Sequence, residues 1–226
     1  GFSYTLAQTI TTGFIAAQGL TTLNTKIYVS SIIIYSYCVS GAMGSANSIL
    51  TGRYKGRQDY NSMIRMNNQN IRLSVFFNFL ISGILYIFHI PLIRLFTDNP
   101  DIISLAGKIM LLDIIVECSR AVNNILDQSL NANGDVKTVL SVSVCACWIF
   151  SVLGSYILSI KLGMGLVGIW IAFIMDELFK AISYLIRWKK DGKKEQNIIG
   201  FLRKIVKKHC INFFLKKKRE KEKKTP

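Results

Sequence analysis

Charged side chains are sparse over most of this 226-residue chain, and histidine is almost absent. Only 18% of the residues are charged, 50% are apolar, and two are histidine. The five cysteines show no metal-binding spacing, and Cys145 and Cys147 lie in an apolar run without a nearby histidine. The sequence also lacks a nucleophile–histidine–acid set and a phosphate-binding loop. We therefore expect no enzyme, no metal site and no bound cofactor.

Long apolar stretches dominate the chain instead. Its mean hydropathy of +0.34 is high for a soluble protein. A soluble domain of this size cannot bury several helices that are apolar on all sides. A helix that spans a membrane, by contrast, consists of roughly 20 mainly apolar residues. The backbone of each span must satisfy its own hydrogen bonds, so helices are expected. The expected spans are about residues 1–20, 27–51, 71–96, 102–128, 138–160 and 165–187.

Positive charge gathers at the C-terminal end of the chain. The formal net charge is +15, and residues 187–226 hold 16 lysines and arginines against four acidic residues. We therefore predict an all-α integral membrane bundle of about six transmembrane helices over residues 1–188 and a basic cytoplasmic tail over residues 189–226. Next to a membrane span, such a tail is expected to bind anionic lipid headgroups rather than nucleic acid.

The loops between the expected spans indicate how the bundle is oriented in the membrane. Basic residues favour the cytoplasmic side, and here they gather in alternate loops and in the tail. We therefore predict a multi-pass protein of the cell membrane with its C-terminus in the cytoplasm. The basic residues on the predicted cytoplasmic side of the bundle are Arg53, Lys55, Arg57, Arg65, Arg72 and Lys137, whereas the opposite loops hold Lys26, Lys161 and the acidic segment 97–101.

The fourth expected span carries a stripe of polar side chains. Asp113, Glu117, Arg120 and Asn124 follow at spacings of four, three and four, which places them on one face of a helix. Charges in the hydrocarbon region are costly, so they face a partner, a cavity or water. One interpretation is a carboxylate that binds a proton, a sodium ion or a cationic substrate, with Glu117 as the first candidate and Asp113 as the second. The other is a buried ion pair, such as Glu117 with Arg120, that fixes helix packing.

Two other spans contain polar candidates. Asp176 and Lys180 in the sixth span are four residues apart, with the carboxylate on the N-terminal side, and we interpret them as a structural ion pair. Asn47 in the second span is a candidate for the lining of a polar cavity. Small polar residues also hold membrane helices together, so a packing role is the alternative for Asn47.

Four stretches of the sequence give a more specific indication. They are GRYKGRQD at residues 52–59, ECSRAVNN at 117–124, LNANGD at 130–135, and GIWIA at 168–172. In order and spacing these stretches resemble motifs of the MATE (multidrug and toxic compound extrusion) transporter family. The motifs are its Gly-rich cytoplasmic loop after the eighth helix, the E-x-x-R-x-x-N pattern of many bacterial members, its GD loop and its last helix. The resemblance covers about residues 1–190.

The resemblance implies one six-helix lobe of a twelve-helix transporter, formed by helices seven to twelve. Family members export cationic drugs or metabolites in antiport with protons or sodium ions, so small cationic substrates and a coupling H⁺ or Na⁺ are implied. The implied protein partner is the N-terminal lobe or a second copy of this chain. The chain starts with glycine in a partly apolar segment, and we expect further sequence before it.

Two other functions stay open at this point. A lipid-linked oligosaccharide flippase of the same superfamily would hold a diphosphate and would need a cavity rich in arginine and lysine. The intramembrane charges here are mixed and include several acids, which favours a cationic substrate. The other possibility is a membrane scaffold that does not transport, encoded by a truncated gene.

The tail yields a first testable prediction. Residues 197–215 (NIIGFLRKIVKKHCINFFL) carry apolar residues at helical spacing with basic residues beside them, the pattern of a helix lying in the membrane interface. Each basic residue near an anionic surface should contribute about 1 kcal/mol. A synthetic peptide of this segment should become helical by circular dichroism with anionic vesicles but not with neutral ones, and salt should weaken its binding. A random coil with both kinds of vesicle would contradict the prediction.

Overall fold

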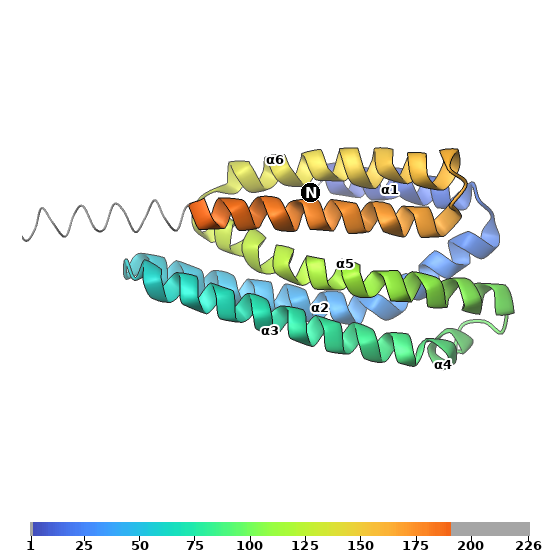
Figure 1. Ribbon diagram of the computed structural model, residues 1–226, viewed down its shortest axis with the longest axis horizontal. Helices are drawn as coiled ribbons and strands as arrows, with labels where there is room; N and C mark the ends of the chain where they lie inside the picture. The colour runs from blue at the N-terminus through green and yellow to red at the C-terminus, as the bar shows by residue number, and fades with distance from the viewer. Residues whose placement is uncertain (1, 191–226) are drawn as a thin grey trace, which may run out of the picture. The chain divides into compact units, whose positions relative to one another are not determined.

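The computed structural model describes residues 2–190, and every element in that range is a helix (Figure 1). The predicted all-α bundle is therefore confirmed, whereas the expected interfacial helix at residues 197–215 lies outside the described residues. The first of two compact units, Gly1–Ile186, contains the bundle. The elements are α1 (Phe2–Ala16), α2 (Leu20–Gly56), α3 (Tyr60–Ile87), α4 (His89–Arg94), α5 (Pro100–Ala132), α6 (Val136–Ala146), the π-helical η1 (Cys147–Gly154) and η2 (Tyr156–Lys161), and a last helix over residues 165–190.

The lengths of the helices suit a membrane-spanning bundle. By length and composition, three helices of the described range can cross a membrane: α2, α3, and the continuous helix Val136–Lys161 that α6, η1 and η2 form. α5 has 33 residues but carries six charged side chains. With 37 residues, α2 is about 55 Å long at 1.5 Å per residue. It therefore extends beyond the hydrocarbon core, which is about 30 Å thick.

The region between the second and third expected spans is helical, which corrects the prediction of a long loop there. α2 continues to Gly56 and α3 begins at Tyr60, so residues 57–59 alone connect them. Asp59 caps α3 by accepting a hydrogen bond from the backbone N–H of Ser62 at 3.2 Å. Arg65 and Arg72 are exposed on α3. The apolar pattern ended the second span too early and began the third too late, because polar side chains stop an apolar run without stopping a helix.

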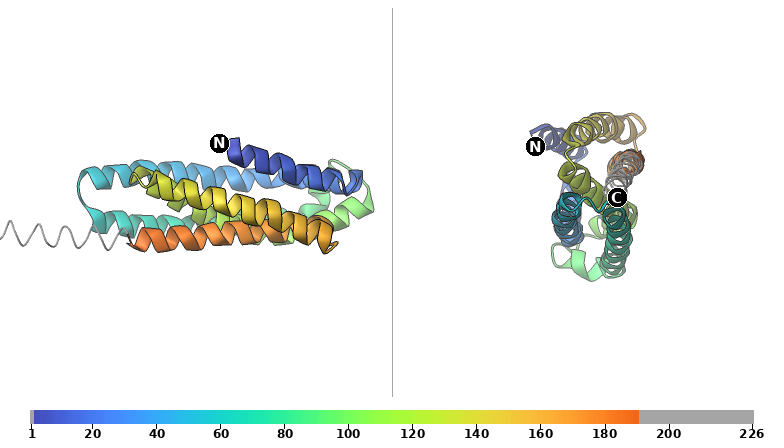
Figure 2. Two further views of the ribbon diagram at one scale, coloured as in Figure 1. Left: turned by 90° about the horizontal axis from the view of Figure 1, so that it is seen from above. Right: turned by 90° about the vertical axis from the view of Figure 1, so that its left-hand side faces the viewer.

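α5 runs between the α2–α3 pair on one side and α6 with the last helix on the other (Figures 1 and 2). α2, α3 and α5 pack closely along a seam of small and polar side chains. Across this seam, Ser36 Oγ donates a hydrogen bond to Asn78 Oδ1 at 2.9 Å. Small residues let membrane helices approach closely, and hydrogen bonds join them where lipid offers no hydrophobic driving force. The residues that α2 buries recur at intervals of three or four and are Thr25, Val29, Ile32, Ser36, Ser40, Gly44, Asn47 and Thr51.

An apolar cluster holds the bundle together near the beginnings of α2, α5 and the last helix. It joins residues of α1, α2, α4, α5 and the last helix, and nearly all of their side-chain surface is buried. This packing fixes the position of α5 relative to the last helix, and both helices carry charged side chains further along. The cluster includes Ile15, Val29, Ile32, Ile93, Ile102, Ile109, Val116, Leu166, Ile169 and Trp170.

Gly44 lies at a close approach of α2 to α5, and it offers a test of stability. A Cβ at this position would lie 2.8 Å from the backbone oxygen of Asn124, well inside normal contact. We expect Gly44→Ala to lower the thermal stability of the detergent-solubilised protein, because overpacking costs about 1–3 kcal/mol. The matched control is Gly41→Ala on the same helix, where a Cβ meets nothing within 4 Å. Equal melting temperatures for the two variants would refute the close approach.

Candidate functional site

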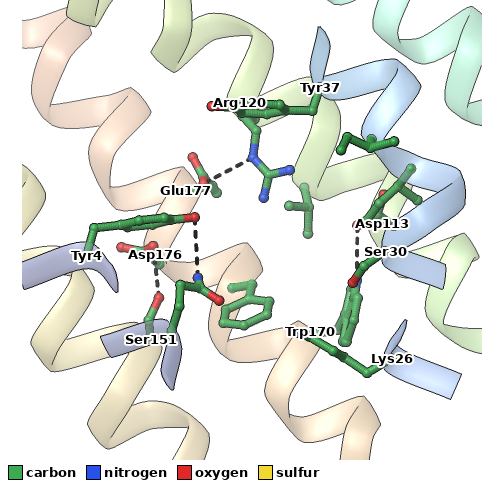
Figure 3. Close-up of a pocket in the computed structure, with 15 residues that line it drawn as sticks. Tyr4, Lys26, Ser30, Tyr37, Asp113, Arg120, Ser151, Trp170, Asp176 and Glu177 are labelled. Carbon is green, nitrogen blue, oxygen red and sulfur yellow. Dashed lines mark hydrogen bonds and ion pairs between the residues drawn. The ribbon is translucent and has the colours of Figure 1, made fainter. Parts of the chain in front are cut away.

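A pocket of about 250 Å³ lies inside the lobe, between α1, α2, α5, η1 and the last helix (Figure 3). Aromatic and aliphatic side chains form part of its wall. Charged side chains from three helices also reach it, which is unusual for the interior of a membrane protein because each such charge is costly there. The charged lining residues are Lys26, Asp113, Arg120, Asp176 and Glu177.

Asp113 faces this pocket from α5. Its Oδ1 accepts a hydrogen bond from Trp170 Nε1 at 3.0 Å. Its Oδ2 is buried and has no hydrogen-bond partner among the described residues, and the residue as a whole is only 2% exposed. A buried polar atom without a partner costs free energy, so this oxygen is a site at which a proton or a cation would be stabilised.

Arg120 joins α5 to the last helix. Its guanidinium contacts Glu117 on its own helix and lies 3.4 Å from Glu177 Oε1 on the last helix. Asn123 Nδ2 donates to the other oxygen of Glu177 at 2.6 Å. The guanidinium also lies 5.8 Å from the ring centroid of Tyr37, within reach of a cation–π contact. Two carboxylates and one aromatic ring thus compensate a single, partly buried cation.

A second ion pair lies next to the first along the last helix. Lys180 Nζ is 2.7 Å from Asp176 Oδ2, and Ser151 Oγ of η1 donates to the same oxygen at 3.0 Å. Asp176 lines the 250 Å³ pocket, whereas Lys180 lines a separate pocket of about 580 Å³. The pair therefore lies between these two pockets.

The residues proposed from the stripe on the fourth span do not all meet at one place. Asp113 and Arg120 line the pocket. Glu117 is fully buried and lies outside the pocket lining, where it contacts Arg120. Asn124 Nδ2 donates to Ser40 Oγ at 2.8 Å, so this side chain points to α2. The spacing of these residues places them on one face of α5. This face is wide enough to contact several neighbouring helices, so its residues have different partners.

Asn47 does not belong to the lining of the 250 Å³ pocket, and its contacts favour the packing role over the cavity role, the two alternatives that the sequence left open. It is fully buried in the seam between α2, α3 and α5. Its Nδ2 donates to Asn67 Oδ1 at 2.7 Å and to Ser129 Oγ at 2.6 Å. Its Oδ1 accepts from Asn70 Nδ2 at 2.6 Å. Its polar atoms are thus bonded to three other side chains, and its surroundings are those of a helix-packing residue.

The pocket lining includes four residues that were not predicted from the sequence as site residues. They are Lys26, Trp170, Tyr4 and Glu177. Lys26 was assigned to a loop, whereas α2 begins at Leu20 and carries Lys26 into the bundle. The signal that could have revealed this is Gly19, which has φ of 108° and separates α1 from α2. Trp170 lies in the GIWIA stretch, but its partner on α5 could not be inferred from spacing.

Comparison with known proteins places this arrangement in a family. The MatE family model matches residues 1–157. The uncharacterized transporter YisQ of Bacillus subtilis (strain 168) is 35% identical over 187 residues, which cover 83% of this chain and 41% of YisQ. The probable multidrug resistance protein NorM of Thermotoga maritima is 23% identical over 160 residues, covering 69% of this chain and 34% of NorM.

Solved structures share the fold. A MOP superfamily transporter from Pyrococcus furiosus superposes with a TM-score of 0.74 at 16% identity, covering 80% of this chain and 40% of that one. A multidrug resistance MATE family transporter in an outward-facing conformation gives a TM-score of 0.67 at 16% identity with the same coverage. The chain thus spans 34–41% of the length of these four relatives. The matches to the family model and to YisQ confirm the resemblance seen in the motifs, and the chain belongs to the MatE family of transporters.

Proposed function

We propose that this chain forms one lobe of a secondary active transporter that exports cationic drugs or metabolites in antiport with protons or sodium ions. The observation that carries the proposal is Asp113, whose Oδ2 is buried without a partner beside a pocket. Membership of the MatE family and similarity to a probable multidrug resistance protein support the export of small molecules. Carboxylates outnumber basic groups in the pocket lining, which favours cationic cargo over a diphosphate.

Competition for one carboxylate gives a simple mechanism of exchange. A proton or a sodium ion bound at Asp113 neutralises the charge that a cationic substrate needs, so the two cannot bind there at full strength together. The coupling between them is reciprocal: the entering ion lowers the affinity for the substrate as much as the substrate lowers the affinity for the ion. Entry of the ion down its gradient would then release the substrate on the outer side.

The ion pairs around Arg120 would keep the lobe rigid during this exchange. Arg120 binds Glu177 on the last helix and Glu117 on α5, so Glu117 would act by holding Arg120 in place. A second lobe, either an N-terminal one or another copy of this chain, would complete the transport pathway. Exchange would then proceed by movement of whole lobes, and the ion pairs of Arg120 and Lys180 would stay intact.

The basic residues support a cytoplasmic position for one end of the lobe. The α2–α3 turn carries Arg57, and Lys55 Nζ donates to the backbone oxygen of Asn133 at 2.6 Å, which ties this turn to the end of α5. The opposite end holds the acidic residues Asp98 and Asp101. Basic residues favour the cytoplasm, so we propose that the α2–α3 turn and the C-terminal tail lie there, with the tail on anionic lipid.

Substitution of the pocket carboxylates tests the transport proposal. We expect Asp113→Asn to raise the substrate concentration needed for half-maximal ethidium export by roughly tenfold or more, because a hydrogen bond to a charged group contributes about 1.5–3 kcal/mol. Glu117→Gln should also impair export, through the loss of its contact with Arg120. The matched control is Asp98→Asn, an exposed carboxylate outside the bundle. Dye accumulation is measured at equal expression in cells that express the transporter.

The same measurement decides between the functions left open by the sequence. Export that collapses with the proton gradient indicates proton coupling, and export that follows the sodium gradient indicates sodium coupling. Export unchanged by both Asp113→Asn and Glu117→Gln would overturn the proposed role of this pocket. A wild-type protein that exports no cation would favour a flippase or a scaffold.

Cysteine labelling tests the orientation. In a variant without native cysteines, Arg57→Cys should react with a membrane-impermeant maleimide only after the cells are permeabilised, whereas Asp98→Cys should react in intact cells. Both residues are exposed, so accessibility within the protein does not limit either reaction. The reverse pattern of labelling would place the α2–α3 turn outside the cell.

A further inference from the structure

The charged residues of the 250 Å³ pocket fall into two groups. Within residues 2–190, ion pairs join Arg120 to Glu117 and Glu177, and Lys180 to Asp176. Two charges of the pocket lining have no ion-pair partner within 4.0 Å in this range, and they have opposite sign. They are the carboxylate of Asp113 and the ammonium group of Lys26.

The two groups face the same pocket without neutralising each other (Figure 3). Asp113 accepts one hydrogen bond from Trp170 and keeps Oδ2 without a partner. Lys26 Nζ lies 3.4 Å from the hydroxyl of Thr12, a long and neutral contact. A charged group in the interior of a membrane protein is expected to pair with another charge or to belong to a substrate pathway. Lys26 has only a neutral contact at the edge of hydrogen-bonding distance, so its ammonium group can bind an anionic group of a ligand in the pocket.

The pocket wall near these charges suits an aromatic ligand. Trp170 and Phe173 have ring centroids 5.7 Å apart in a tilted arrangement, and both line the pocket. Ile33, Ile34 and Val116 add an aliphatic wall. Binding pockets typically combine apolar walls with a few polar groups that fix the orientation of the ligand. Here the charged groups of the lining without an ion-pair partner among the described residues are one anion and one cation.

We propose that this pocket binds a small aromatic zwitterion, with its cationic group at Asp113 and its anionic group at Lys26. The inference rests on the proposed transport function and specifies the substrate class of the same site. A molecule with both charges satisfies Asp113 and Lys26 at once and adds no net charge to the pocket. A simple cation pairs only with Asp113 and is repelled by Lys26. A simple anion pairs only with Lys26 and is repelled by Asp113.

Three indole compounds that differ chiefly in charge test the proposal. Tryptophan is zwitterionic, tryptamine is cationic and indole-3-propionate is anionic. Their dissociation constants are measured with radiolabelled compounds on membrane vesicles from cells that express the transporter, with vesicles lacking it as background. We expect wild-type protein to bind tryptophan more tightly than either of the other two. Lys26→Gln should lower the ratio of tryptophan affinity to tryptamine affinity at least tenfold.

Two further variants control for folding and for charge in general. Lys26→Arg keeps the positive charge and should retain the preference for the zwitterion. Lys108→Gln removes an exposed lysine of α5 that does not line the pocket and should leave the ratio unchanged. A wild-type preference for tryptamine would overturn the proposal. So would an equal effect of Lys26→Gln on tryptophan and tryptamine, which would mean that the lysine blocks the pocket or supports its structure.

Ethidium export separates this inference from the function on which it rests. Ethidium is a permanent cation and needs no anchor at Lys26. If cells export ethidium in an Asp113-dependent manner but the vesicles show no preference for tryptophan, the zwitterion proposal fails and the transport proposal stands. If ethidium export is absent or independent of Asp113, the proposed export of cations fails, and the binding measurements on vesicles alone decide whether the pocket binds the zwitterion.

Discussion

Compensation of the partly buried guanidinium of Arg120 is the interaction on which the lobe depends. An isolated positive charge in a membrane interior is costly, and here Glu117 on the same helix and Glu177 on the last helix share it. Asn123 holds Glu177 in place with a bond of 2.6 Å. Because one partner is local and the other is 57 residues away, the cluster exists only when α5 and the last helix are packed together. It therefore fixes the two helices that carry Asp113 and its hydrogen-bond donor Trp170.

The seam between α2, α3 and α5 supplies the rigid support for this cluster. Asn47, Asn67 and Ser129 form a closed group of hydrogen bonds, and Gly44 allows the backbone of α5 to approach α2 directly. Polar groups bonded in this way hold helices in register where lipid gives no hydrophobic advantage to association. The bundle thus uses two kinds of polar side chain: those that bond to one another across the seam, and Asp113 and Lys26 in the pocket, which have no ion-pair partner within 4.0 Å among the described residues.

In our proposal, exchange at the pocket follows from the difference between these two kinds of polar side chain. Arg120 is paired with Glu177, and Lys180 is paired with Asp176, so a ligand gains little by replacing these charges. Asp113 and Lys26 have no such partner among the described residues, and a ligand gains most by binding there. MatE relatives are more than twice as long as the matched region, and in our proposal a second lobe would provide the movement that exposes this pocket to each side of the membrane in turn.

The sequence by itself determined the helices, their membrane character and the polar face of α5, because apolar runs and residue spacing are local properties. It also identified Asp176 and Lys180 as a close pair, since both lie on one helix. The sequence did not show that Glu177 binds Arg120, that Asn47 lies in the seam, or that Lys26 faces the pocket. Spacing along one helix defines a direction but not the neighbour in that direction. Only the packing of α2, α5 and the last helix decided which polar groups compensate one another and which stay available to a ligand.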